Sequence, residues 1–184
     1  AAGIAPVPGW RLRQPDLAET LRALATRGHE GFYRGPVAER LVHGVRQAGG
    51  IWTADDLASY RVVEREPITF TYRDMRVISA SPPSSGGVVL AEALQILADV
   101  DLVAQPPAER VHWTTEAMRR AYRDRARYLG DPDFVDLPLA QLLDPDYAAS
   151  LRADIDPDRA TPSPTLASDD TASLDRHTTH FSVI

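Results

Sequence analysis

The apolar residues of this chain recur mainly at helical spacing, and this pattern constrains the fold more than any other feature. The longest such segment covers residues 107–129, where Val111, Met118, Tyr122 and Leu129 share one helical face. Four arginines lie largely off that face: Arg119, Arg120, Arg123 and Arg127. An arginine-rich helix face is usually solvated. We therefore predict one long helix whose apolar stripe is buried and whose arginines lie in water.

Shorter segments with the same spacing predict further helices. They cover residues 15–27, 36–48, 88–100 and 145–153, and the third carries a stripe of Leu90, Leu94 and Leu97. Thr53 followed by Asp56 has the spacing of a capping box, which predicts a short helix ending near Ser59. Residues 68–80 alternate apolar and polar side chains around a turn at Arg73 and Asp74, which indicates a β-hairpin. The fold class predicted is α+β, mostly helical.

Composition limits the possible functions. The hydrophobic and charged fractions, 43% and 25% of 184 residues, are ordinary for a globular protein of one domain or one domain with a tail. No segment is apolar enough to cross a membrane, and no signal peptide is expected in this segment. A net charge of −6 argues against nucleic acid as a partner. The absence of cysteine excludes thiol catalysis, disulfides and thiolate metal sites.

Two loops contain residues that sometimes bind ligands. Residues 84–87 precede a predicted helix, whose free N–H groups could hold an anion, but capping of the helix is the simpler function for the serines. Asp131 and Asp133 flank a proline, and two carboxylates are too few for a calcium site. We predict that they form a turn.

The end of the chain contains the candidate catalytic residue. Residues 156–175 are rich in Pro, Ser, Thr and Asp without an apolar period, which predicts an exposed linker. A β-stretch follows from Thr178. A threonine can act as an acyl-transfer nucleophile with its own α-amino group as base, but the His177–Thr178 bond must first be cleaved. Without such cleavage, Thr178 only begins a strand. His177 and His180 would point to opposite sides of that strand, so no zinc site is expected.

Four segments together resemble the gamma-glutamyltranspeptidase family. They are DDLASY at residues 55–60 with VER at 63–65, PPSSGG at 82–87, the stretch from Glu116-Ala117 to Asp133-Phe134, and TTHFSV at 178–183. Their order and spacing together are specific, and the resemblance covers nearly the whole chain from about Gly9. Members of this family are N-terminal nucleophile hydrolases with a four-layer αββα core.

The resemblance implies a precursor that cleaves itself between His177 and Thr178, with Thr178 as nucleophile and, after cleavage, as α-amino base. It implies γ-glutamyl transfer from glutathione or other γ-glutamyl compounds to water, amino acids or peptides, without a cofactor or metal. Members are typically periplasmic or extracellular. The family's other substrate-binding residues lie outside this segment, so we transfer none of them, and we expect the segment alone to be inactive and its αββα fold to be incomplete.

The resemblance also predicts how the chain is divided. Residues 1–155 correspond to the C-terminal part of the large subunit, 156–177 to the linker before the processing site, and 178–184 to the start of the small subunit. The partners implied are the remaining parts of both subunits. Two alternatives stay open: a glutaryl-cephalosporin acylase of the same family, and a non-catalytic helical interaction module in which Thr178 is only a strand residue.

Overall fold

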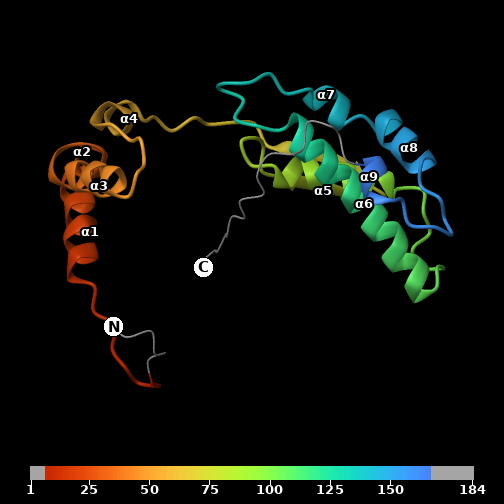
Figure 1. Ribbon diagram of the computed structural model, residues 1–184, viewed down its shortest axis with the longest axis horizontal. Helices are drawn as coiled ribbons and strands as arrows, with labels where there is room; N and C mark the ends of the chain where they lie inside the picture. Colours follow the sequence, from red (N-terminus) through yellow and green to blue (C-terminus); the bar gives the residue numbers. More distant parts are fainter. Residues whose placement is uncertain (1–6, 167–184) are drawn as a thin grey trace. The chain divides into compact units, whose positions relative to one another are not determined.

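The computed structural model describes residues 7–166, which form two compact units divided between Glu64 and Arg65 (Figure 1). The first unit is helical, and the second contains a β-hairpin and further helices. The division of the chain into large-subunit body, linker and small-subunit start stays a prediction.

Within residues 7–64 the first unit contains four helices: α1 (Pro15–Arg27), α2 (Glu30–Tyr33), α3 (Gly35–Gln47) and α4 (Ala54–Ser59). The predicted capping box of α4 is confirmed. The Thr53 N–H donates to Asp56 Oδ2 at 2.7 Å, and the Asp56 N–H donates to Thr53 Oγ1 at 3.2 Å. The Thr53 hydroxyl also donates to Asp56 Oδ2 at 2.8 Å, and the hydrogen bonds from the side chain and the backbone N–H of Thr53 lower the pKa of Asp56. The acids of this segment therefore serve the helix terminus, as predicted.

The second unit begins with the predicted hairpin. Strands β1 (Ile68–Tyr72) and β2 (Met75–Ser79) pair antiparallel, with Phe70 opposite Val77. Ile68 and Phe70 are buried against helix α5 (Gly86–Ile96). Gly87 is needed where the hairpin meets this helix, because a Cβ there would lie 2.2 Å from the Ala80 carbonyl oxygen.

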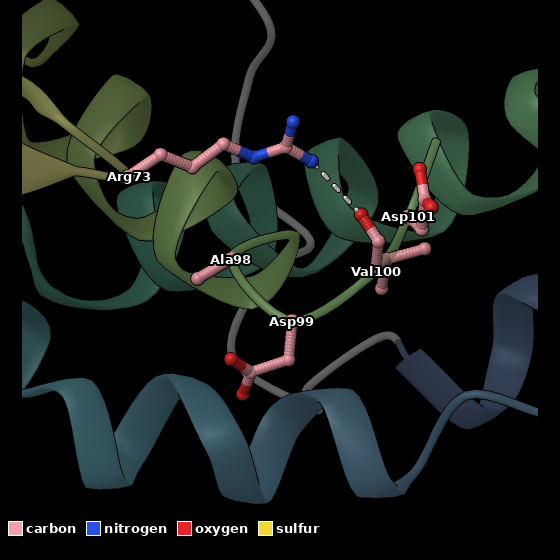
Figure 2. Close-up of a pocket in the computed structure, with 5 residues that line it drawn as sticks. All are labelled: Arg73, Ala98, Asp99, Val100 and Asp101. Atoms are coloured by element: carbon pink, nitrogen blue, oxygen red, sulfur yellow. Dashed lines mark hydrogen bonds between the residues drawn. The ribbon is translucent and has the colours of Figure 1, made fainter. Parts of the chain in front are cut away.

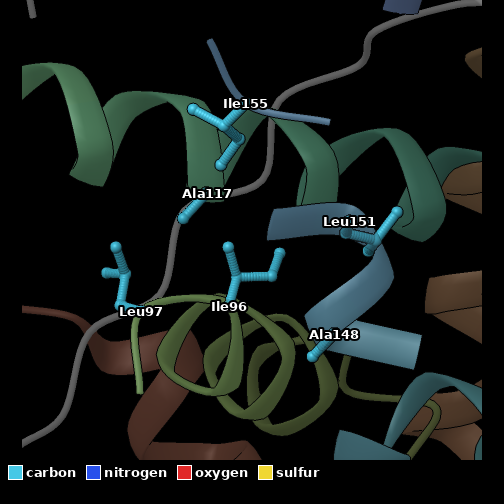
Figure 3. Packing of buried hydrophobic residues seen from close by; sticks show 6 residues of the cluster. All are labelled: Ile96, Leu97, Ala117, Ala148, Leu151 and Ile155. Atoms are coloured by element: carbon cyan, nitrogen blue, oxygen red, sulfur yellow. The ribbon is translucent and has the colours of Figure 1, made fainter. Parts of the chain in front are cut away.

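Helix α5 is central to the second unit. It packs against α6 (Pro107–Tyr128), α7 (Leu139–Leu142) and α8 (Pro145–Ala153) as well as the hairpin, and α6 also contacts the short helix α9 (Ser163–Leu166). One hydrophobic cluster lies between α5, α6 and α8 (Figure 3). Its buried residues are Ile96, Leu97, Ala117, Ala148, Leu151 and Ile155. The helical segment predicted for residues 107–129 is confirmed, as is that for 145–153.

The predicted buried face of α6 is wrong for three of its four residues, whereas the fourth, Leu129, is half-buried against the cluster that contains Ile68 and Phe70. Val111, Met118 and Tyr122 are 66%, 47% and 53% exposed, whereas the buried residues are Glu116, Ala117, Arg120, Ala121 and Asp124. The two alanines let α6 pack closely on α5, and the charged side chains beside them are buried because they bind one another. Arg120, predicted to lie in water, is only 2% exposed.

The predicted stripe of α5 is also partly wrong. Leu97 is buried, but Leu90 is 43% exposed, and the helix buries instead mainly smaller residues together with one isoleucine and one acid. These residues are Gly87, Val88, Ala91, Glu92, Ala93 and Ile96. Because the helix has neighbours on several sides, its buried surface is wider than a single leucine stripe.

Candidate functional site

The predicted catalytic and processing residues, Thr178 and His177, lie outside the described residues, as does His180. The structure does describe the chain that leads towards them, up to Leu166. The site therefore has to be built from the contacts that hold residues 154–166 on the helical body.

A buried ion pair on α6 lies beneath this segment. Arg120 Nη1 donates to Glu116 Oε2 at 2.6 Å, and both side chains are 2% exposed. The other guanidinium nitrogen, Arg120 Nη2, donates to the Asp154 carbonyl oxygen at 2.9 Å and to Thr161 Oγ1 at 3.2 Å. Both bonds join α6 to residues that follow α8.

Neighbouring residues of α6 extend the same contact. The Thr161 N–H donates to Glu116 Oε1 at 3.3 Å. Arg119 Nη1 donates to that oxygen as well, and its Nη2 donates to Ser163 Oγ at 3.2 Å. His112 Nε2 lies 2.8 Å from the carbonyl oxygen of Asp156. Since residues four apart lie on one helix face, a single face of α6 binds the chain from 154 to 163.

The electrostatics of Glu116 follow from these partners. Burial by itself would raise the pKa of Glu116, but hydrogen bonds from Thr161, Arg120 and Arg119 outweigh burial and lower it to about 2. Glu116 is therefore a carboxylate at neutral pH, and its charge is compensated by two arginines.

A second buried cluster lies further along α6. Asp124, 1% exposed, accepts a hydrogen bond from Arg123 Nε at 2.7 Å and another from the Tyr147 hydroxyl at 2.5 Å. Glu92 of α5 is also 1% exposed, and its Oε1 has no hydrogen-bond partner within the described part of the chain.

The protonation of Glu92 follows from these surroundings. Burial, the charge of Asp124 and a hydrogen bond with Asp124 raise the pKa of Glu92 to about 8, although Arg123 opposes them. Burial and the bond to Asp124 also raise the pKa of Tyr147. Glu92 is therefore mainly uncharged at neutral pH, which avoids two unscreened negative charges in one buried cluster.

A shallow pocket beside the hairpin turn is not a built site. Arg73 Nη2 donates to the Val100 carbonyl oxygen at 3.0 Å (Figure 2). Asp99, which also lines the pocket, pairs with Arg152 at 2.6 Å, and Asp101 Oδ1 accepts backbone N–H bonds from its own turn. Each charged side chain of the pocket thus already has a structural partner.

The two loops singled out in the sequence have structural functions. Asp131 accepts the Asp133 N–H at 3.0 Å, and Asp133 pairs with Arg65 at 2.7 Å, which confirms the predicted turn. The predicted capping by the serines at residues 84–87 is wrong for Ser85, whose side chain makes no capping bond and instead accepts a hydrogen bond from Arg125. Across residues 7–166 no cluster of three or more His, Cys, Asp or Glu side chains is arranged to hold a metal ion.

The family model described as Gamma-glutamyltranspeptidase matches residues 2–184 of this chain. The chain belongs to the gamma-glutamyltranspeptidase family. The glutathione hydrolase proenzyme of Pseudomonas sp. (strain A14) is 48% identical over 179 residues, which is 96% of this chain and 31% of that protein. The acylase ACY 1 proenzyme of Pseudomonas sp. (strain V22) is 40% identical over 79% of this chain and 26% of its own length. The chain thus spans less than a third of the length of each of these relatives.

Solved structures of the gamma-glutamyltranspeptidase family show the same arrangement. The gamma-glutamyltranspeptidase of Helicobacter pylori is 40% identical with a TM-score of 0.76, covering 90% of this chain and 48% of that one. The cephalosporin acylase of Bacillus halodurans is 34% identical with a TM-score of 0.74, covering 84% of this chain and 28% of that one. These matches confirm the predicted fold class, a mostly helical α+β part of an N-terminal nucleophile hydrolase.

The sequence analysis missed the buried charged residues on α5 and α6: Glu92, Glu116, Arg120 and Asp124. One signal was available for two of them. Glu116 and Arg120 are four residues apart with the acid first, which is the favourable order for a helical ion pair. Nothing in the sequence distinguishes this buried pair from an exposed one.

Proposed function

We propose that the chain is part of a proenzyme that hydrolyses or transfers the γ-glutamyl group of glutathione and related amides. Thr178 is its nucleophile. The observation that carries this proposal is the family match, which runs to residue 184 and so includes the TTHFSV motif that begins at Thr178. The glutathione hydrolase relatives are themselves proenzymes by name, which agrees with a processing step.

The chemistry has two stages. The Thr178 hydroxyl attacks the carbonyl of His177, and the nitrogen of Thr178 leaves that carbonyl as an ester forms. Water then hydrolyses the ester, which releases His177 as a carboxylate and Thr178 as a free N-terminus. In the mature enzyme the α-amino group takes the proton from the same hydroxyl as it attacks a γ-glutamyl carbonyl. The C–N bond of that amide then breaks, the α-amino group returns the proton to the departing amine, and the glutamyl group stays on Thr178 as an ester. The acyl group then passes to water or to an acceptor amino acid or peptide.

The processing step is tested with the full-length polypeptide, which continues through the small subunit. On a denaturing gel we expect two bands, and N-terminal sequencing of the smaller product should begin at Thr178. The Thr178→Ala variant should remain a single band, whereas Thr179→Ala, the matched neighbour, should still split. Two bands from Thr178→Ala would remove this residue from the mechanism.

An acylase activity is the second candidate, because an acylase ACY 1 proenzyme and a cephalosporin acylase both match most of this chain. The two activities are separated by giving the processed enzyme a γ-glutamyl anilide and a glutaryl-cephalosporin in parallel. We expect faster turnover of the γ-glutamyl substrate, since the most similar relative reported above is a glutathione hydrolase proenzyme. Faster release of the glutaryl group from the cephalosporin would favour the acylase activity.

The remaining parts of both subunits are the proposed partners of this chain. The exposed apolar residues Val111, Met118 and Tyr122 on α6 provide a surface for such packing. Because the oxyanion hole and the glutamyl-binding residues of the family lie outside this segment, we expect the 184 residues alone to be inactive. No helix within residues 7–166 is long and apolar enough to span a membrane. We propose a periplasmic or extracellular location for the whole protein.

A further inference from the structure

One face of α6 binds residues 154–163 through the buried side chains of Glu116 and Arg120. We propose that Glu116 and Arg120 are positioning residues for self-cleavage, because they anchor Asp154 and Thr161 in the segment that precedes the His177–Thr178 bond, with Thr161 lying 16 residues before His177. This inference rests on the proposed function, since it assigns a task within the processing of that proenzyme.

The geometry of the contacts carries the inference. Arg120 donates to both the Asp154 carbonyl oxygen and Thr161 Oγ1, while Glu116 accepts the backbone N–H of Thr161. Two of these three contacts use backbone atoms, so they fix the path of the chain and not only a side chain. Ile155, 6% exposed, is inserted in the hydrophobic cluster beside Ala117 of α6 and fixes the start of the same segment, next to Asp154 (Figure 3).

The kind of contact between α6 and residues 154–163 also argues that it positions the chain more than it stabilises the fold. Residues 156–166 are otherwise exposed or half-buried, and the sequence there is polar and rich in proline. A buried ion pair is a poor way to gain stability, because desolvation of the two charges offsets much of their attraction. Such a pair instead supplies directional hydrogen bonds, and these bonds form only when the groups that the pair binds lie in one arrangement. Here those partners are the residues that lead to the scissile bond.

The test uses the full-length precursor and measures the rate of appearance of the two bands. In the double variant Glu116→Met/Arg120→Leu the ion pair is replaced by apolar groups of similar size, and the melting temperature of the precursor is measured alongside its cleavage rate. We expect its self-cleavage to be about tenfold slower, equivalent to about 1.4 kcal/mol in the barrier. Thr161→Val, which replaces only the hydroxyl with a methyl group, should slow cleavage less than the double variant does. Thr161→Ser keeps the hydroxyl and should cleave at the parent rate.

A matched control separates positioning from loss of stability. Leu142→Ala opens a cavity in the other hydrophobic cluster of the unit, away from residues 154–163. It should lower thermal stability while the precursor still cleaves at the parent rate. The inference is overturned if Leu142→Ala slows cleavage as much as the double variant, or if the double variant and Thr161→Val both cleave at the parent rate. If instead Thr178→Ala itself still splits, the proposed function fails and not the anchor alone.

Discussion

Replacing Glu92 with glutamine should stabilise the protein at neutral pH, and the gain should depend on pH. Glu92 is 1% exposed, and its pKa is raised from 4.5 to about 8, first by burial and then by the nearby Asp124. As pH rises above 4.5, the unfolded chain releases the Glu92 proton while the folded protein retains it. Stability is therefore lost progressively from the ordinary pKa up to about 8. A glutamine does not titrate, so this loss disappears in the variant.

The magnitude follows from the two pKa values. Because the folded protein keeps Glu92 protonated, its free energy of unfolding is lower by about 1 kcal/mol at about pH 5 and by about 3 kcal/mol at about pH 7. The difference in unfolding free energy between Glu92→Gln and the parent should therefore grow by about 2 kcal/mol over that range. Effects that are independent of pH, such as burial of the amide, cancel in this comparison.

The measurement is urea unfolding of both proteins, full-length and carrying Thr178→Ala to keep one chain, at several pH values between these limits. Glu109→Gln is the matched control, because it makes the same chemical change at a solvent-exposed position of α6. A difference between Glu92→Gln and the parent that stays constant with pH would refute the reasoning, since Glu92 would then be charged in the folded protein.

Three further predictions follow from buried contacts. Gly87→Ala should lower the free energy of unfolding by about 1–3 kcal/mol, because the new Cβ would meet the Ala80 carbonyl; chemical unfolding measures this. Tyr147→Phe should cost about 1–3 kcal/mol, because buried Asp124 loses a hydroxyl donor, and the loss should be visible as a lower melting temperature in calorimetry. The pKa of Glu116 is depressed to about 2, so its stabilisation is complete above 4.5 and lost as pH falls towards 2; acid unfolding of Glu116→Gln should lack that component of the titration.

Local structure in this chain could be predicted because its signals are local. Pro15 and Gly28 bound α1, Thr53 with Asp56 caps α4, and the alternation around Arg73 gives the hairpin. Each of these signals acts within a few residues, so it does not depend on what packs against the segment. The short helix α2 was missed because four residues are too few to show a periodic pattern.

The packing of α6 could not be predicted in the same way. A stripe of large apolar residues normally identifies the buried face, but here Ala117 and Ala121 are fully buried while Met118 is about half exposed. The chain covers about a third of its relatives, so a residue that is exposed here can be covered in a longer polypeptide. Thr178 remains a prediction, because it lies outside the described residues.

The buried charges of α6 are better explained by geometry than by stability. Glu116 and Asp124 are two helical turns apart and both face the interior, but their partners differ. Asp124 bonds to Tyr147 within α8, so it ties one helix to another. Glu116 and Arg120 instead bond to backbone atoms of an irregular segment, which has few apolar side chains to hold it in place. Directional bonds to that backbone can fix its path where hydrophobic packing cannot. For this reason we assign the positioning of the chain that leads to the His177–Thr178 bond to Glu116 and Arg120, and not to Asp124.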